Sequence, residues 1–148
     1  MKTFFAIAAL AALLSSGGAS NANAAARVMV QLQDPSTDPA IGSMQIKLDQ
    51  TSVKAGTIHF DVTNLSKNLV HEMIVVKASG LAASLPYDAK ADRAIEARIK
   101  TLGEVSELQP SASGSLTLAM KPGSYLLICN QPGHLHGGMA ARLIVTPR

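Results

Sequence analysis

Three residues near the C-terminus of the chain carry side chains that bind soft metal ions, and they are evenly spaced. Cys129, His134 and Met139 form the pattern C-x4-H-x4-M. A thiolate and two imidazoles in one plane, with a weak axial thioether, suit copper in both of its common oxidation states. Zinc fits this set less well, because methionine is not among its usual ligands. The pattern therefore predicts a site for one copper ion.

The residues between these three ligands favour a loop that closes around one point. Pro132 fixes its own backbone φ, and Gly133 accepts conformations that are barred to other residues. Gly137-Gly138 gives the same freedom just before Met139. We expect strands over 124–129 and 140–146, which would hold the two ends of this loop.

The C-x4-H-x4-M pattern supplies only one imidazole, so a second must come from elsewhere in the fold. His71 is the candidate, because it lies in the apolar run Leu69-Val70-His71-Glu72-Met73. His59 is the competitor. It alternates with apolar residues on a strand expected over 58–62, so its side chain is predicted to face solvent.

Structural roles compete with metal binding at these positions. Cys129 alone would be a small buried hydrophobe, and Met139 could be a core methionine. His71 could be a core histidine. His136 could replace His134 only by shortening the distance to Met139 to three residues; otherwise it is expected at the rim, as a partner contact or a weaker metal contact. The combined spacing favours the metal site.

The first residues predict export. Lys2 precedes the apolar stretch 4–14, and Ala22-Asn23-Ala24 fits a signal-peptidase site, with a second possible cut after Ala26. The apolar stretch is too short to span a membrane. We expect a secretory signal over residues 1–24 and one domain over 25–148, found in the periplasm or secreted, with no membrane anchor after cleavage.

The cysteine count supports a metal role in such a compartment. The chain has one cysteine, whereas exported proteins stabilised by disulfides usually carry an even number. A lone thiol is lost to oxidation unless it is buried or bound to a metal. The formal net charge is +3, and the charges are scattered, so nucleic acid is not an expected partner.

Alternating apolar and polar residues predict an all-β fold. Strands are expected over 28–33, 44–49, 58–62, 69–77, 116–120, 124–129 and 140–146. The segment Ala89–Leu102 reads as a helix with Asp88 as its N-cap and Gly103 as its stop, followed by a loop over 104–112. The pattern indicates an antiparallel Greek-key β-sandwich with one helical insertion.

Longer segments resemble the cupredoxins, the blue copper proteins. The resemblance rests on Tyr125-Leu126-Leu127-Ile128-Cys129-Asn130-Gln131-Pro132-Gly133-His134 followed by Gly138-Met139, and on Val53-Lys54-Ala55-Gly56-Thr57-Ile58 and Val62-Thr63-Asn64-Leu65. The loop spacing is similar to that of rusticyanin and the auracyanins. The resemblance implies a type 1 copper ion with His71, Cys129 and His134 as equatorial ligands and Met139 as the axial ligand.

The resemblance also implies a function. It indicates one-electron transfer in the periplasm or outside the cell, with the exposed edge of His134 as the exit for the electron. The redox partner would be a cytochrome or a larger copper enzyme. A carrier, buffer or assembly factor that delivers copper to an accepting protein is the alternative. An enzyme is not expected, since the chain lacks further copper-binding clusters.

One residue departs from the family pattern. Glu72 stands where plastocyanin and azurin have asparagine after the first histidine. In the family, the backbone N–H of this residue helps to fix the cysteine sulfur. If Glu72 points inward, its charge is expected to stabilise Cu(II) and lower the reduction potential.

Overall fold

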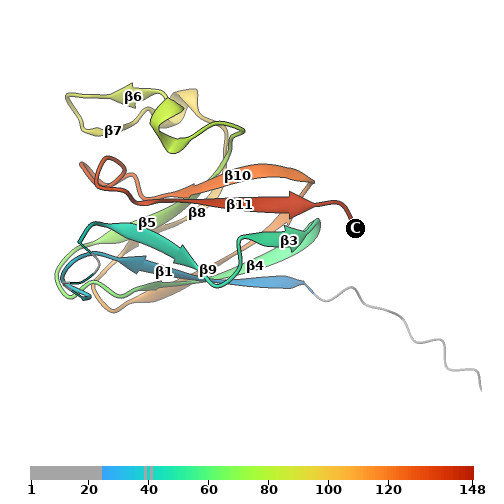
Figure 1. The fold of residues 1–148 in the computed structure, drawn as a ribbon, viewed down its shortest axis with the longest axis horizontal. Coiled ribbons are helices and arrows are strands. Elements are labelled where there is room, and N and C mark those ends of the chain that lie inside the picture. Colours follow the sequence, from blue (N-terminus) through green and yellow to red (C-terminus); the bar gives the residue numbers. More distant parts are fainter. Residues whose placement is uncertain (1–24, 39, 41) are drawn as a thin grey trace, which may run out of the picture.

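The two large β-sheets of the chain pack face to face. The computed structural model describes residues 25–38, 40 and 42–148; the expected signal peptide lies outside these residues. The first sheet has the order β2-β1-β4-β9 and the second the order β3-β11-β10-β5-β8 (Figure 1). The strands are β1 (Ala26–Gln33), β2 (Gln45–Leu48), β3 (Ser52–Lys54), β4 (Gly56–Asn64), β5 (His71–Lys77), β8 (Thr101–Leu108), β9 (Ser113–Met120), β10 (Gly123–Ile128) and β11 (Ala140–Thr146).

The predicted all-β sandwich is confirmed, but its sheets are mixed rather than purely antiparallel. β1 pairs with β4 in parallel, with Val30 opposite Val62. β11 pairs with β3 in parallel, with Val145 opposite Val53. The other pairings within the two sheets are antiparallel. No helix in the described part of the chain is long and apolar enough to cross a membrane.

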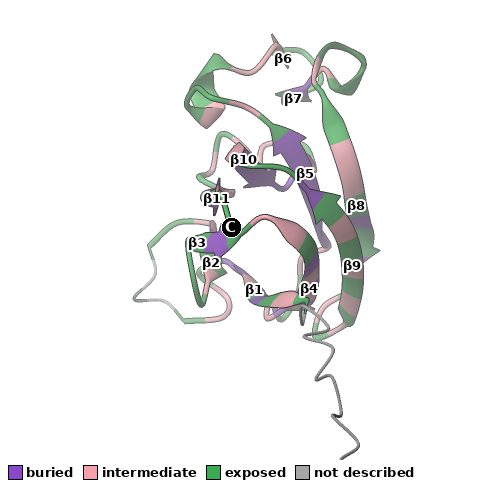
Figure 2. Ribbon diagram, turned by 90° about the vertical axis from the view of Figure 1, so that its right-hand side faces the viewer, coloured by how far each residue is buried: buried purple, intermediate pink, exposed green. Residues whose placement is uncertain are grey.

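Alternate side chains of both sheets fill the space between them, as the period of a strand requires. This core includes Val28, Val30, Leu32, Ile58, Phe60 and Val62 from the first sheet and Met73, Val75, Tyr125, Leu127, Leu143 and Val145 from the second. β5 differs from the other strands because its first six residues are all buried (Figure 2). Its outer face is covered too, which explains why residues 73–76 are all apolar.

The cover on β5 comes from the segment between β5 and β8, which lies over the outer face of the second sheet (Figure 1). A second apolar cluster joins residues of β5 and β10 to this segment: Ile74, Val76, Leu126 and Ile128 pack with Leu85, Ala94 and Ile99. The segment contains the two-residue strands β6 (Tyr87–Asp88) and β7 (Arg93–Ala94) and the 3₁₀ helices η2 (Ala82–Ser84) and η3 (Glu96–Arg98).

The helix predicted over Ala89–Leu102 is therefore wrong. The carboxylate of Asp88 accepts hydrogen bonds from the N–H groups of Lys90 and Ala91, as expected for an N-cap, but the chain then turns. Asp92 has a φ of +53°, which ends any helix there. Ala94 pairs instead with Tyr87, so tertiary pairing overrides a helical spacing of apolar residues.

The loop predicted over 104–112 begins later than expected, because β8 (Thr101–Leu108) extends into it. β8 is one of the two edge strands of the second sheet. It alternates buried Val105 with exposed Glu104 and Ser106. Charged residues are common on edge strands, where they discourage pairing with other chains, and they hide the strand from a reading of hydrophobic pattern.

Candidate metal centre

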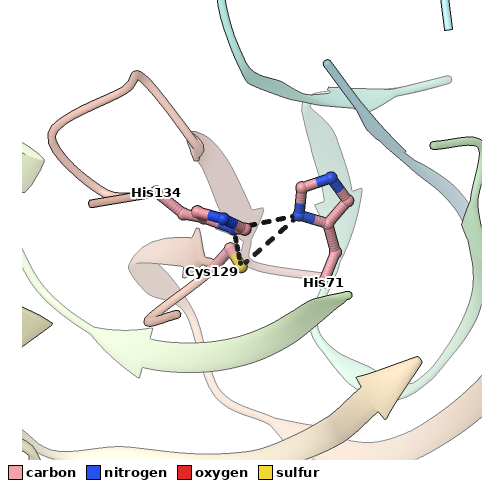
Figure 3. A group of neighbouring side chains, drawn as sticks. All are labelled: His71, Cys129 and His134. Carbon is pink, nitrogen blue, oxygen red and sulfur yellow. Dashed lines mark hydrogen bonds between the residues drawn. The ribbon is translucent and has the colours of Figure 1, made fainter. Parts of the chain in front are cut away.

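Two strands and one loop bring His71, Cys129 and His134 together at one end of the sandwich. His71 is the first residue of β5, and Cys129 follows the last residue of β10, whose Ile128 is paired with Ile74 of β5. The ring Nδ1 atoms of the two histidines are 3.1 Å apart. The Cys129 Sγ lies 3.4 Å from His134 Nδ1 and 3.9 Å from His71 Nδ1 (Figure 3).

These distances fit a single metal ion. An ion with bonds of about 2.0 Å to nitrogen and about 2.3 Å to sulfur, at the centre of a plane of three donors, separates those donors by roughly 3.5–3.8 Å. The three candidate donor atoms all lie within 4.8 Å of one another. The cluster is thus close to the required spacing, and both imidazoles present the same ring atom, Nδ1.

Cys129 is completely buried, and its sulfur accepts a hydrogen bond from the backbone N–H of Glu72 at 3.4 Å. Burial raises the pKa of the thiol to about 11. The sulfur is therefore protonated at neutral pH, and a metal must displace this proton in order to bind. The backbone N–H then remains as a donor to the thiolate, which is the contact that the resemblance to the cupredoxins implies for residue 72.

His71 is oriented from behind by Asp34. The His71 Nε2 lies 3.0 Å from Oδ2 of Asp34, and both side chains are buried, with 0% and 2% exposure. Burial lowers the pKa of His71 in spite of this carboxylate. For Asp34, burial would raise the pKa, but hydrogen bonds with Ser36, Ser66 and His71 outweigh it and hold the pKa well below its usual range.

Asp34 was not foreseen as part of the site. The Asp34-Pro35-Ser36 sequence indicates only a turn after the first strand. Asp34 reaches His71 because β1 runs parallel to β4, with Leu32 opposite Asn64, and the chain returns to β5 soon afterwards. A parallel pairing between distant strands leaves no local pattern that a single sequence displays.

His134 is held in a tight turn of the loop. Its N–H donates to the carbonyl of Gln131 at 3.0 Å, and Gly133 adopts a φ of +81°, as expected for the Pro-Gly turn. His134 is only half-buried. Burial and the neighbouring His71 lower its pKa, so the ring is neutral at pH 7 and has a lone pair available on one nitrogen.

Met139 closes the same loop. Its side chain is completely buried, its N–H donates to the carbonyl of His134 at 3.0 Å, and its carbonyl accepts from the N–H of Cys129 at 3.1 Å. Gly138 permits this arrangement with a φ of +104°, and a Cβ there would lie only 2.8 Å from the carbonyl oxygen of Met44. The backbone of Met139 is thus tied to the two loop ligands.

The remaining histidines lie outside the cluster. His59 is on β4, where its Nδ1 contacts the hydroxyl of Thr117 at 2.7 Å. His136 is exposed on the same loop as His134, with its Nδ1 3.1 Å from both Asp92 Oδ1 and the hydroxyl of Tyr87. Its place at the rim agrees with one of the alternatives that the sequence left open.

Glu72 does point inward. The residue is 8% exposed, and its Oε1 accepts a hydrogen bond from the N–H of Asn130, next to Cys129, at 3.0 Å. Burial raises the pKa of Glu72. Glu72 therefore follows the candidate ligand His71 in the chain, and its carboxylate is bonded to the residue that follows the candidate ligand Cys129. The sequence alone did not establish this second contact.

The segment between β5 and β8 is bonded to the loop through Asn130 and Gly133 as well as through His136. Asn130 accepts from the N–H of Ala94 at 2.7 Å and donates to Glu96 Oε1 at 2.8 Å. The N–H of Gly133 donates to the carbonyl of Asp92 at 2.8 Å. The sequence did not indicate these contacts with the segment.

Comparison with known proteins gives similar structures but no close relatives. No family model matches the chain, and no curated protein matches it. An auracyanin from Roseiflexus castenholzii is 25% identical, with a TM-score of 0.59; the match covers 84% of this chain and 99% of that one. Rusticyanin from Thiobacillus ferrooxidans is 19% identical, with a TM-score of 0.59 and coverage of 81% and 76%.

A third similar structure is that of a blue copper protein. Auracyanin A from Chloroflexus aurantiacus is 21% identical, with a TM-score of 0.55; the match covers 83% of this chain and 100% of that one. Auracyanin A is thus a blue copper protein, and rusticyanin is likewise a copper protein. The chain has the cupredoxin fold, and its cluster of His71, Cys129 and His134 fits a type 1 copper site.

Proposed function

We propose that the protein is a small exported electron carrier that holds one type 1 copper ion through His71, Cys129, His134 and Met139. The observation that carries the proposal is the buried cluster of two Nδ1 atoms and one thiol sulfur, 3.1–3.9 Å apart. The copper ion supplies a one-electron couple between Cu(I) and Cu(II). The four residues together offer sulfur for the reduced state and imidazole for both states.

The contacts within the chain hold the ligands in place, which favours electron transfer over delivery of a loosely bound copper ion. His71 is fixed by Asp34, and the loop is fixed by the backbone bonds of Met139 and by the contacts of Asn130 and Gly133 with the neighbouring segment. Ligands that are held in place change little between two oxidation states, so little rearrangement opposes electron transfer. The half-exposed edge of His134 is the proposed exit for the electron.

The proposed location and partners follow from the same role. We infer a signal peptide over residues 1–24, a mature domain over 25–148 and a place in the periplasm or outside the cell. A lone cysteine in an oxidising compartment is protected when it is buried and bound to a metal. The proposed partner is a redox protein, such as a cytochrome or a larger copper enzyme.

The visible spectrum of the purified protein with Cu(II) tests the proposal. Strong thiolate-to-copper absorption is expected in the wild type and should be absent in Cys129→Ser. Cys129→Ser keeps the size of the side chain but removes the soft sulfur, so it is the matched control. The reduced protein should then pass one electron to a chemical oxidant and regain its colour.

The same experiment separates the alternative of copper delivery. A protein that stays colourless with Cu(II), binds only Cu(I) and releases it rapidly to a chelator would favour delivery of copper over transfer of electrons. A protein that keeps its copper against the chelator and cycles repeatedly between a coloured Cu(II) form and a colourless Cu(I) form would support the electron carrier.

A further inference from the structure

We propose that Asp34 is a positioning residue for the metal centre, which sets the ring orientation and the proton of His71 and strengthens His71 as a donor. The inference rests on the proposed function, because it concerns how the same site is built. Asp34 lies between β1 and β2, in a part of the chain that is distant from His71 in sequence. Its carboxylate contacts the ring of His71 on the side away from Cys129.

The hydrogen-bond chemistry fixes which nitrogen of His71 carries the proton. An ionised carboxylate can only accept hydrogen bonds, so the Nε2 of His71, 3.0 Å from Asp34 Oδ2, must be the donor. In a neutral imidazole the other nitrogen then has the lone pair. That atom is Nδ1, which faces Cys129 and His134. Asp34 therefore presets the tautomer that a metal ion requires.

The turn that carries Asp34 is itself held firmly. Asp34 Oδ1 accepts from the N–H of Ser36 at 2.7 Å, and the Ser36 hydroxyl contacts that of Ser66 at 3.2 Å. The N–H of Lys67 donates to the Ser36 hydroxyl at 3.1 Å. The turn is thus bonded to the segment that leads into β5, so the carboxylate and the strand that carries His71 form one rigid unit.

The carboxylate cannot be replaced by an amide without loss. Asp34 uses one oxygen for the N–H of Ser36 and the other for the N–H of His71. An asparagine has only one acceptor oxygen, so its NH₂ group must face one of these two donors. Asp34→Asn therefore breaks a buried contact while it keeps the size and shape of the side chain. It also removes a negative charge that favours Cu(II) over Cu(I).

The test compares Asp34→Asn with Asp38→Asn. Asp38 lies in the same region but is exposed, and its Oδ1 accepts from the N–H of Ala40 at 2.9 Å, a contact that asparagine can keep. We expect Asp34→Asn to bind Cu(II) roughly 10–100-fold more weakly and to have a higher midpoint potential. Asp38→Asn should match the wild type in both. Equal affinities and potentials in all three proteins would overturn the inference.

A second measurement needs no metal and no variant. Nitrogen NMR of the metal-free wild type should show His71 neutral, with its proton on Nε2 and slow to exchange with water; a proton on Nδ1 would overturn the inference. This readout decides the question even if Asp34→Asn does not fold. A wild type that stays colourless with Cu(II) would refute the proposed function, while the His71 tautomer would still show whether Asp34 positions the ring.

Discussion

The two histidines of the cluster are held in opposite ways. His71 begins a strand that is buried on both faces, and its second nitrogen is bound to a buried carboxylate. His134 lies on a loop, half-exposed, and its position depends on a turn through Gln131 and Gly133. One ligand is thus part of the rigid core, and the other is at the boundary between the core and solvent.

This difference gives the two histidines different roles in the site. A ligand that is anchored in the core fixes the geometry of the metal and resists loss of the ion. A ligand at the surface gives an electron a short route to a partner protein. Both tasks need the same imidazole chemistry, so the surroundings of each ring, rather than the ring itself, separate the two roles.

The largest expected effect is on the stability of the metal-free protein. His71→Ala removes one hydrogen-bond partner of the buried Asp34 carboxylate together with the packing of a buried ring, which should reduce the free energy of unfolding by about 3 kcal/mol. His134→Ala removes a half-exposed ring and should cost less than about 1 kcal/mol. Urea denaturation of both metal-free variants measures the difference. Equal losses would mean that the two rings are held alike.

The control for this prediction is a double-mutant cycle. If the contact between Asp34 and His71 accounts for the loss, Asp34→Ala combined with His71→Ala should destabilise the protein by less than the sum of the two single changes. An additive result would assign the loss to packing of the His71 ring instead.

The comparison of the two histidines also explains what the sequence could predict. Cys129, His134 and Met139 lie in one loop, so their spacing in the sequence was enough to predict them as ligands. His71 could be chosen because it interrupts an apolar run. Asp34 could not, since it reaches His71 only through the parallel pairing of β1 with β4.

The predicted helix failed for a related reason. The apolar spacing of Ala91, Ile95 and Ile99 is helical, yet Ala94 is bonded to Asn130 on both its N–H and its carbonyl. Local propensity is a weak determinant when a distant side chain offers the backbone other partners. The sandwich itself was predictable, because the alternation of apolar residues in its strands is a local pattern.

The next effect concerns pH and both histidines. Burial lowers the folded pKa of His71 and of His134 below the ordinary value of 6.5. The unfolded chain therefore binds protons first as the pH falls, so the stability that these groups contribute above pH 6.5 is lost on acidification. The free energy of unfolding of the metal-free protein should decrease between pH 7.5 and 5.5.

Denaturation curves at several pH values measure this dependence. They are best recorded with Glu72→Gln as the parent, since the raised pKa of Glu72 acts in the opposite direction. Adding His134→Gln should flatten the dependence in part, and the remainder belongs to His71. A stability that rises on acidification would contradict the neutral, buried state of both rings.

A smaller effect is expected from Glu72. The buried carboxylate of Glu72 accepts a hydrogen bond from the N–H of Asn130, and the backbone N–H of Glu72 donates to the sulfur of Cys129. Glu72→Gln keeps the backbone donor and removes the charge, so the midpoint potential of the copper-loaded protein should rise by something on the order of tens of millivolts. Voltammetry measures it, with Glu107→Gln on β8 as an exposed control. An unchanged potential would mean that the carboxylate is already neutral or too well screened to act.

The smallest effect should come from His136, the second histidine of the loop. It is exposed and bound to Asp92 and Tyr87, outside the cluster, whereas His134 faces Cys129 from the same loop. His136→Ala should therefore leave the visible spectrum and the midpoint potential of the copper-loaded protein almost unchanged, while His134→Ala should alter both. If His136→Ala instead shifts the absorption as strongly as His134→Ala does, both loop histidines reach the metal, and the division between an anchored ligand and one surface ligand is wrong.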